Sequence, residues 1–198
     1  MWQGDLFGNE DGGGLPVAGL RLVEEAVSPK AEADLMQRID GVPLAPFRFQ
    51  QWEGKRLTAH YGRAYDHEKG LQVDADPLPD WLLKLRASLA PLFEIAEQEL
   101  VQALLIRYDP GAGIGWHRDR PIYGRIMGLS LGAPAIMRFR RRLAKNSGEG
   151  GRTKFDRVPV ALPPRSLYLL DGAARQEWEH SIAPMEDTRR SITFRTLR

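Results

Sequence analysis

The sequence predicts a mainly β fold with flanking helices (α+β), of the sandwich, barrel or jelly-roll type. From about residue 101 onward, short segments of strand-forming residues alternate with turn signals such as Asp109-Pro110-Gly111 and Gly132-Ala133-Pro134. About eight such strands follow one another, which is typical of antiparallel sandwiches and barrels. Their connections are too short to contain crossover helices, and this argues against a parallel α/β sheet.

Before residue 101 we expect one strand and two helices. A strand is predicted over Leu20–Val27, and a helix over Ala31–Ile39. Ser28 is placed to begin that helix and Gly41 to end it. Asp80 offers an N-cap for the second helix. Four leucines follow it at the spacing of one helical face: Leu82, Leu85, Leu89 and Leu92.

The strands expected in the second half define the core of the domain. They are Ala103–Tyr108, Gly115–Asp119, Ile126–Leu131, Ala135–Arg142, Lys154–Ala161, Ser166–Leu170, Glu177–Ile182 and Arg189–Thr196. Residues 1–14 are polar and rich in glycine, so we expect a flexible tail there. No second linker follows, which predicts a single domain over 15–198, with an N-terminal extension over 15–100 and the catalytic core over 101–198.

The composition restricts the chemistry that the chain can perform. Hydrophobic residues make up 42% and charged residues 27% of the sequence, as in ordinary globular proteins. Cysteine is absent, so a metal must be bound by histidine, carboxylate or water. The N-terminus resembles no targeting segment, and no long apolar run is present. We therefore expect a soluble cytoplasmic protein with no membrane partner, and a monomer.

Positive charge is concentrated in one part of the chain. Residues 107–157 contain 12 Lys and Arg against 4 Asp and Glu, a local charge of +8, whereas the whole chain carries +2. This segment predicts a surface that faces a polyanion such as nucleic acid. An arginine-rich face that is simply solvated is the alternative that composition leaves open.

Three residues form a candidate metal site. Because side chains two apart on a strand share a face, His117 and Asp119 can converge on one ion, and a jelly roll can bring His180 opposite them. Two imidazoles and one carboxylate leave three coordination positions open, as in non-haem Fe(II) oxygenases. The alternative is a salt-bridged turn at His117-Arg118-Asp119 and a structural histidine at 180.

The last predicted strand carries a second polar set close to His180. Its alternation places Arg189, Ser191, Thr193 and Arg195 on one face, with the apolar residues between them on the other. Arginine binds carboxylates through paired, charge-assisted hydrogen bonds. The strand therefore predicts a seat for a carboxylate ligand beside the metal, and an edge strand with a polar outer face is the alternative.

From about Leu104 to the C-terminus the chain resembles the AlkB family of Fe(II)/2-oxoglutarate-dependent dioxygenases. The resemblance is carried by LLIRYDPGAGIGWHRD, GLSLGAPAIMRFR, EWEHSI and RRSITFR, in family order. It implies a double-stranded β-helix (jelly-roll) core, with Fe(II) as the metal and 2-oxoglutarate and O2 as cosubstrates. The iron ligands that it implies are His117, Asp119 and His180.

The resemblance also implies a cosubstrate site. Tyr108 matches a tyrosine that hydrogen-bonds 2-oxoglutarate, and Arg189 and Arg195 match the arginines that anchor its carboxylates. Ser191 and Thr193 belong to the same strand, where the family has R-x-N-x-T-x-R, so Ser191 stands in place of asparagine. Ile106 stands where the family has a further asparagine.

A lid over the target nucleotide is implied at residues 48–66, whose sequence mixes aromatic and basic residues. The candidate substrate residues are Arg56, His60, Tyr61, Arg63, Tyr65, Arg118, Arg138 and Arg140. Tyr61 and Tyr65 are candidates for stacking on a base, and ordinary loop packing is the alternative for both. Further basic residues of the predicted hairpin are candidates for holding phosphates: Arg141, Arg142, Lys145, Arg152, Lys154 and Arg157.

The preferred hypothesis is oxidative demethylation (dealkylation) of N-alkylated bases in DNA or RNA, as DNA repair or as RNA demethylation. In this reaction the N-alkyl carbon is hydroxylated and an aldehyde is released. A second hypothesis is a 2-oxoglutarate-dependent hydroxylase of a protein or small molecule. A third is a nucleic-acid-binding module without catalysis, in which the triad holds zinc or no metal.

Overall fold

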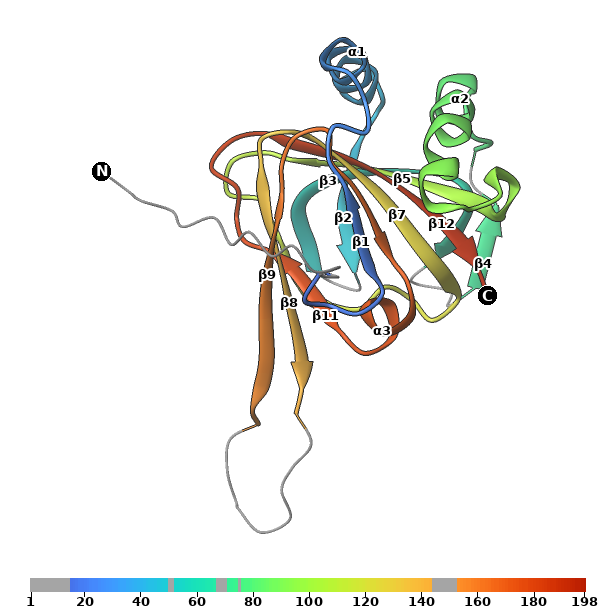
Figure 1. The fold of residues 1–198 in the computed structure, drawn as a ribbon. Helices are drawn as coiled ribbons and strands as arrows, with labels where there is room; N and C mark the ends of the chain where they lie inside the picture. Colours follow the sequence, from blue (N-terminus) through green and yellow to red (C-terminus); the bar gives the residue numbers. More distant parts are fainter. Residues whose placement is uncertain (1–14, 50–51, 67–70, 75, 144–152) are drawn as a thin grey trace.

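The computed structural model describes residues 15–49, 52–66, 71–74, 76–143 and 153–198 as two antiparallel sheets that pack face to face (Figure 1). The large sheet has the strand order β1-β10-β7-β12-β5-β3-β2, with β4 beside β3, and the small sheet has the order β6-β11-β8-β9. Neighbouring strands come from distant parts of the sequence, as in a jelly roll. The predicted mainly β fold with flanking helices is therefore confirmed.

The strand bounds are β1 (Leu20–Val23), β2 (Ala45–Phe49), β3 (Trp52–Asp66), β4 (Leu71–Asp74), β5 (Leu100–Tyr108), β6 (Ile114–His117), β7 (Tyr123–Gly132), β8 (Ala135–Arg142), β9 (Phe155–Leu162), β10 (Leu167–Leu170), β11 (Glu179–Ile182) and β12 (Arg189–Leu197). The helices are α1 (Pro29–Asp40), α2 (Asp80–Leu89) and α3 (Gly172–Gln176), with 3-10 turns at Ala90–Phe93 and Glu97–Glu99. No helix in the described part of the chain is both long and apolar enough to cross a bilayer.

The two faces of the large sheet are covered by different layers, because the side chains of each strand alternate between them. The outer face packs against α1 and α2, which lie on the same side of the sheet in Figure 1, and it buries Leu105, Ile192 and Phe194. The inner face turns toward the small sheet, where Ile126 packs with Phe139. Polar side chains at this sheet-to-sheet interface therefore line an enclosed space.

The N-terminal half follows the sequence expectations in part. The Ser28 hydroxyl accepts a hydrogen bond from the Ala31 N–H at 3.2 Å and begins α1 as predicted. Strand β1 ends earlier than expected because Glu25 adopts φ 51°, which a strand cannot accommodate. Asp80 is the first residue of α2 rather than its cap. Leu92 is 40% exposed because it lies in the 3-10 turn, off the face of the other leucines.

The stretch 46–66 shows little periodicity in sequence, yet its described residues belong to β2 and β3, which pair with each other. Strand β3 then pairs with β5 in the large sheet. Strand pairing depends on partners that are distant in sequence, so local pattern alone did not reveal these two strands. In the second half each predicted strand corresponds to one observed strand, with small differences at the ends.

A buried carboxylate connects α1 to the large sheet, and this contact is testable. Glu32 accepts hydrogen bonds from the Gly132 N–H at 2.9 Å and from Arg165 at 3.4 Å. We expect Glu32→Ala to lower the free energy of unfolding by about 1–3 kcal/mol, because buried donors lose their acceptor.

Asp34→Ala is the matched control, since Asp34 makes only an exposed pair with Arg38. Its loss should stay below about 1 kcal/mol. Denaturant unfolding measures both variants, and equal losses would contradict the role given to Glu32.

Candidate metal centre

The three predicted ligands meet on the inner side of the small sheet. His117 and His180 face each other directly in the antiparallel ladder of β6 and β11, with ring centroids 4.2 Å apart. One ligand atom from each of His117, Asp119 and His180 lies within 4.8 Å of the others. Strand β6 ends at His117, two residues earlier than predicted, so Asp119 reaches the site from the segment that follows the strand.

Each ligand is oriented by a neighbouring group. Nδ1 of His117 lies 2.9 Å from the Gly115 carbonyl, so this nitrogen donates and Nε2 is the metal-binding atom. Oδ1 of Asp119 accepts a hydrogen bond from Arg195 at 2.9 Å. Oδ2 of Asp119 lies 3.6 Å from Nε2 of His180. One atom of each side chain is therefore directed at a common point.

The electrostatics keep His180 and Asp119 in the protonation states that bind metal. Burial, with His117 nearby, lowers the pKa of His180 to about 3, so its imidazole is neutral. Burial alone would raise the pKa of Asp119, but Arg195 and the two histidines hold it well below its usual value. A neutral imidazole and an ionised carboxylate are the forms that coordinate a metal ion. This donor set fits iron in a three-ligand facial site.

Arg195 contacts a metal ligand in this structure. Besides Asp119, its guanidinium donates to the side-chain oxygen of Gln102 at 2.8 Å. The amide nitrogen of Gln102 in turn lies 3.4 Å from Nδ1 of His60. Arg195 therefore holds the carboxylate in place, while its role as a cosubstrate anchor stays a prediction.

Arg189 has the environment of an anion-binding residue. It is 1% exposed, it donates to the Ser130 hydroxyl at 3.2 Å, and its guanidinium carbon lies 5.2 Å from the centre of the Tyr108 ring. Nη1 of Arg189 is buried and has no hydrogen-bond partner in the part of the chain that the structure describes. Within the described residues no carboxylate pairs with it. A buried cation without an anion is costly, so this position fits a carboxylate supplied by a ligand.

The polar face of β12 lies inside the protein as predicted. Ser191, Thr193 and both arginines are buried on the inner face of the large sheet. Strand β12 is flanked by β7 and β5, so the alternative of a solvent-facing edge strand is wrong. A cavity of about 1090 Å³ contains the metal triad and this polar face together.

The predicted substrate residues divide between two places. Arg56 is buried, lies over the Phe47 ring at 3.9 Å and lines the large cavity. Arg118 also lines it and donates to the Gln176 carbonyl at 3.0 Å. His60 borders both this cavity and a groove of about 540 Å³ beside β2 and β3.

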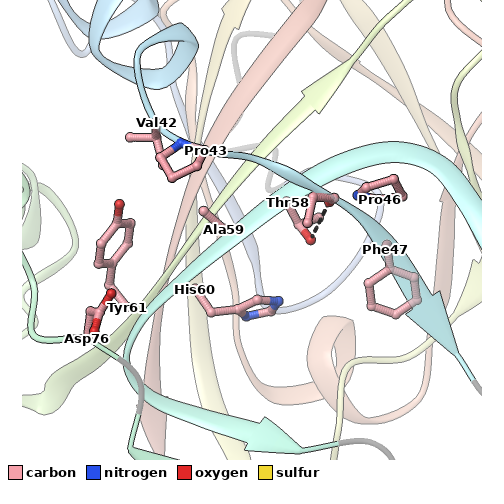
Figure 2. Close-up of a pocket in the computed structure, with 10 residues that line it drawn as sticks. Val42, Pro43, Pro46, Phe47, Thr58, Ala59, His60, Tyr61 and Asp76 are labelled. Carbon is pink, nitrogen blue, oxygen red and sulfur yellow. Dashed lines mark hydrogen bonds between the residues drawn. The ribbon is translucent and has the colours of Figure 1, made fainter.

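Figure 2 shows that groove, with Tyr61 and Asp76 at one end and Phe47 at the other. Tyr61 lies in the groove and not in the large cavity. Arg63 is exposed. The side chain of Tyr65 lies outside the described residues. The predicted base-stacking pair therefore does not meet in the large cavity within the described structure.

The arginines of the β8–β9 hairpin lie away from the metal. Arg138 and Arg140 lie over the Trp116 ring, at 5.3 and 4.5 Å from its centre, and neither lines the large cavity. Arg140 also pairs with Glu179 at 2.5 Å, and Arg141 pairs with Glu177 at 2.9 Å.

These pairs neutralise part of the basic segment. Lys145 and Arg152 lie outside the described residues, whereas Arg142, Lys154 and Arg157 lie on the two strands or beside them.

Sequence reasoning missed several buried residues of the site, among them Gln102 and Tyr168. Gln102 faces Arg195 across the β5–β12 pairing, and Tyr168 of β10 lines the large cavity. Neither belongs to a motif, and the pairing of distant strands is what brings them to the site.

Comparisons with known proteins agree with this geometry. The chain matches the profile of the 2OG-Fe(II) oxygenase superfamily, where 2OG is 2-oxoglutarate, over residues 19–196. It is 30% identical over 197 residues to uncharacterized protein L905 of Acanthamoeba polyphaga mimivirus. This match covers 90% of this chain and 85% of that protein.

The chain is also 32% identical over 174 residues to the Xenopus tropicalis protein named tRNA (carboxymethyluridine(34)-5-O)-methyltransferase alkbh8. This match covers 84% of the chain but only 25% of that longer protein. Among solved structures, OsALKBH1 has the same fold with a TM-score of 0.64 and 14% identity, and the match covers 93% of this chain and 99% of that one.

The environment of Arg189 predicts that its substitution weakens the binding of 2-oxoglutarate. We expect Arg189→Lys to weaken 2-oxoglutarate binding about 10-fold to 100-fold, because lysine cannot reproduce paired hydrogen bonds to a carboxylate. Arg190→Lys is the matched control, since Arg190 pairs with Asp40 instead of facing the cavity. Calorimetric titration of the metal-loaded chain measures the 2-oxoglutarate affinity of both variants. Equal affinities would contradict the assignment of Arg189 to carboxylate binding.

The contact of Arg195 with Asp119 predicts that substitution of Arg195 changes the pH dependence of metal binding. In Arg195→Met the cation that lowers the pKa of Asp119 most is gone, while burial still raises this pKa. Because the carboxylate must be ionised to bind metal, the pH midpoint of Mn(II) binding should move upward. Metal titrations at several pH values test this, with Arg190→Met as control, and an unchanged midpoint would refute it.

Proposed function

We propose that this chain oxidatively removes alkyl groups from N-alkylated nucleobases in DNA or RNA. The chain belongs to the 2OG-Fe(II) oxygenase superfamily and is an AlkB-like Fe(II)/2-oxoglutarate-dependent dioxygenase. The iron, when bound, couples oxidation of the alkyl carbon by O2 to conversion of 2-oxoglutarate into succinate and CO2. Hydroxylation of an N-methyl carbon gives an unstable hemiaminal, which collapses to the free base and formaldehyde.

We assign the iron to His117, Asp119 and His180, and the distal carboxylate of 2-oxoglutarate to Arg189. The observation that carries this assignment is the fully buried guanidinium of Arg189, without an acidic partner among the described residues, in the same cavity as the triad. Arg195 fixes one oxygen of Asp119 and leaves the other for the metal. Tyr108 supports Arg189 through its ring.

The shape of the cavity supports a nucleobase as substrate. Ligand pockets are typically about 300–1,000 Å³, and this cavity reaches about 1090 Å³, which leaves room for a base beside the cosubstrate. A base must leave its stack to enter such a site. Arg56 and Arg118 on the cavity wall are placed to contact the extruded nucleotide.

Two further observations support a nucleic acid over another substrate. The AlkB-like relative from Xenopus is named for its action on tRNA. The segment 107–157 carries a local excess of positive charge, and Arg142 and Arg157 have no carboxylate partner among the described residues. Cations of this kind contact phosphates without reading sequence.

Formaldehyde release is the direct test. Oligonucleotides of DNA and RNA, each with one N-methylated base, are incubated with the chain, Fe(II), 2-oxoglutarate and O2. We expect formaldehyde and succinate in equal amounts, and no formaldehyde with His117→Ala. If no methylated DNA or RNA yields formaldehyde while the chain still binds 2-oxoglutarate, the nucleobase assignment fails.

Salt dependence separates nucleic acid from other substrates. Several phosphate contacts predict that the affinity for a methylated oligonucleotide falls steeply with ionic strength. Arg142→Ser and Arg157→Ser together should reduce that slope, because each removes one cation. A weak affinity that does not respond to salt would instead support a protein or a small molecule as substrate.

A further inference from the structure

A buried tyrosine that neither the metal triad nor the arginine strand includes lies on the inner face of the large sheet. Tyr168 is 7% exposed and lines the same cavity as the triad. The strand register places it opposite Gly128 of β7, and Gly128 is in turn opposite Thr193 of β12. These three residues form one row across the sheet, next to the row that contains Ser191.

The absence of a side chain at Gly128 allows the tyrosine ring to cross β7. A Cβ atom at Gly128 would lie 2.2 Å from Cζ of Tyr168 and 2.3 Å from its hydroxyl oxygen. Real Cβ contacts are never this short, so the phenol tip occupies the space that any other residue at this position would fill. The tip of the ring therefore lies over β7, on the side of β10 from which β12 follows in the sheet.

The residues around the Tyr168 hydroxyl belong to the proposed 2-oxoglutarate site. Arg189 donates a hydrogen bond to the hydroxyl of Ser130, which lies two residues from Gly128 on the same face of β7. Thr193 lies opposite Gly128 on β12. Burial raises the pKa of the phenol, so the hydroxyl keeps its proton and can donate it in a hydrogen bond. The tip of the phenol therefore lies at Gly128, two residues along β7 from the serine that contacts Arg189, and in the same cavity as the triad.

A ligand that binds both at the metal triad and at Arg189 would lie beside the Tyr168 hydroxyl. A five-carbon dicarboxylate with one end at the metal and the other at Arg189 extends along the inner face of β12. A carboxylate has about four lone-pair sites, so one arginine does not saturate it. A second donor from a different strand fixes the position of the distal carboxylate and hence the accepted chain length.

We propose that Tyr168 is a further 2-oxoglutarate-binding residue, whose hydroxyl donates a hydrogen bond to the distal carboxylate held by Arg189, and that Gly128 is required to admit its ring. The assignment rests on the proposed function in that it takes 2-oxoglutarate as the cosubstrate. Tyr168 lies outside the sequence segments that carry the family resemblance, whereas Gly128 begins one of them. The proposal makes Tyr168 a determinant of cosubstrate choice.

The test compares two ligands that differ only at the distal end. 2-Oxoglutarate and 2-oxopentanoate have the same chain length, but a methyl group replaces the distal carboxylate in the second. Calorimetric titrations use the full chain loaded with Fe(II) in the absence of O2. We expect Tyr168→Phe to weaken 2-oxoglutarate binding about tenfold, as for a lost hydrogen bond to a charged group, and to leave 2-oxopentanoate binding and Fe(II) affinity unchanged.

Gly128→Ala provides a second variant, measured together with its melting temperature. Its methyl group should displace the phenol and produce the same loss for the dicarboxylate, again without a loss for 2-oxopentanoate. An equal loss for both ligands in Tyr168→Phe would overturn the proposal, because the tyrosine would then act on the shared end or on packing. Unchanged 2-oxoglutarate affinity in this variant would overturn it as well.

No nucleic acid is present in these titrations. A failure of Tyr168 to affect cosubstrate binding is therefore distinct from a failure of the chain to oxidise methylated bases.

Discussion

The antiparallel pairing of β6 with β11 places His117 directly opposite His180, and the chemistry of the protein depends on this register. A shift by one residue would turn one imidazole to the opposite face of the small sheet, because side chains alternate along a strand. Asp119 then needs only a short turn to complete the site. The partner strand β8 places Phe139 opposite His180, with the two ring centroids 6.1 Å apart.

The two sheets supply different parts of one reaction centre. The small sheet contributes the histidines, whereas the large sheet contributes the cations that receive and position carboxylates. Arg195 connects the two sheets, since it starts from β12 and holds the metal ligand Asp119. Arg189 lies at the other end of the same strand face, where its buried Nη1 has no hydrogen-bond partner among the described residues, and we therefore assign a ligand carboxylate to it. The outer face of the large sheet carries the apolar packing against α1 and α2, so the inner face can be polar.

Much of this arrangement could be predicted from the sequence, because strand alternation is visible in it. The residues Arg189 to Arg195 alternate polar and apolar, and both faces lie where the alternation predicts. The contact of Arg195 with Asp119 was not predictable, since it depends on where a turn directs a side chain. The ion pairs of Arg140 with Glu179 and of Arg141 with Glu177 were also not predictable, because Glu179 lies on β11 and Glu177 at the end of α3, far from the arginines in sequence.

Metal content and cosubstrate binding, measured together, test the central claim most directly. The chain is purified without air, its metal is quantified, and the visible absorption is recorded while 2-oxoglutarate is added. A triad beside an anion seat predicts one bound iron per chain and an absorption band that grows with 2-oxoglutarate and is lost in Arg189→Met. A chain that holds zinc or no metal, or whose spectrum does not respond to 2-oxoglutarate, would contradict the account.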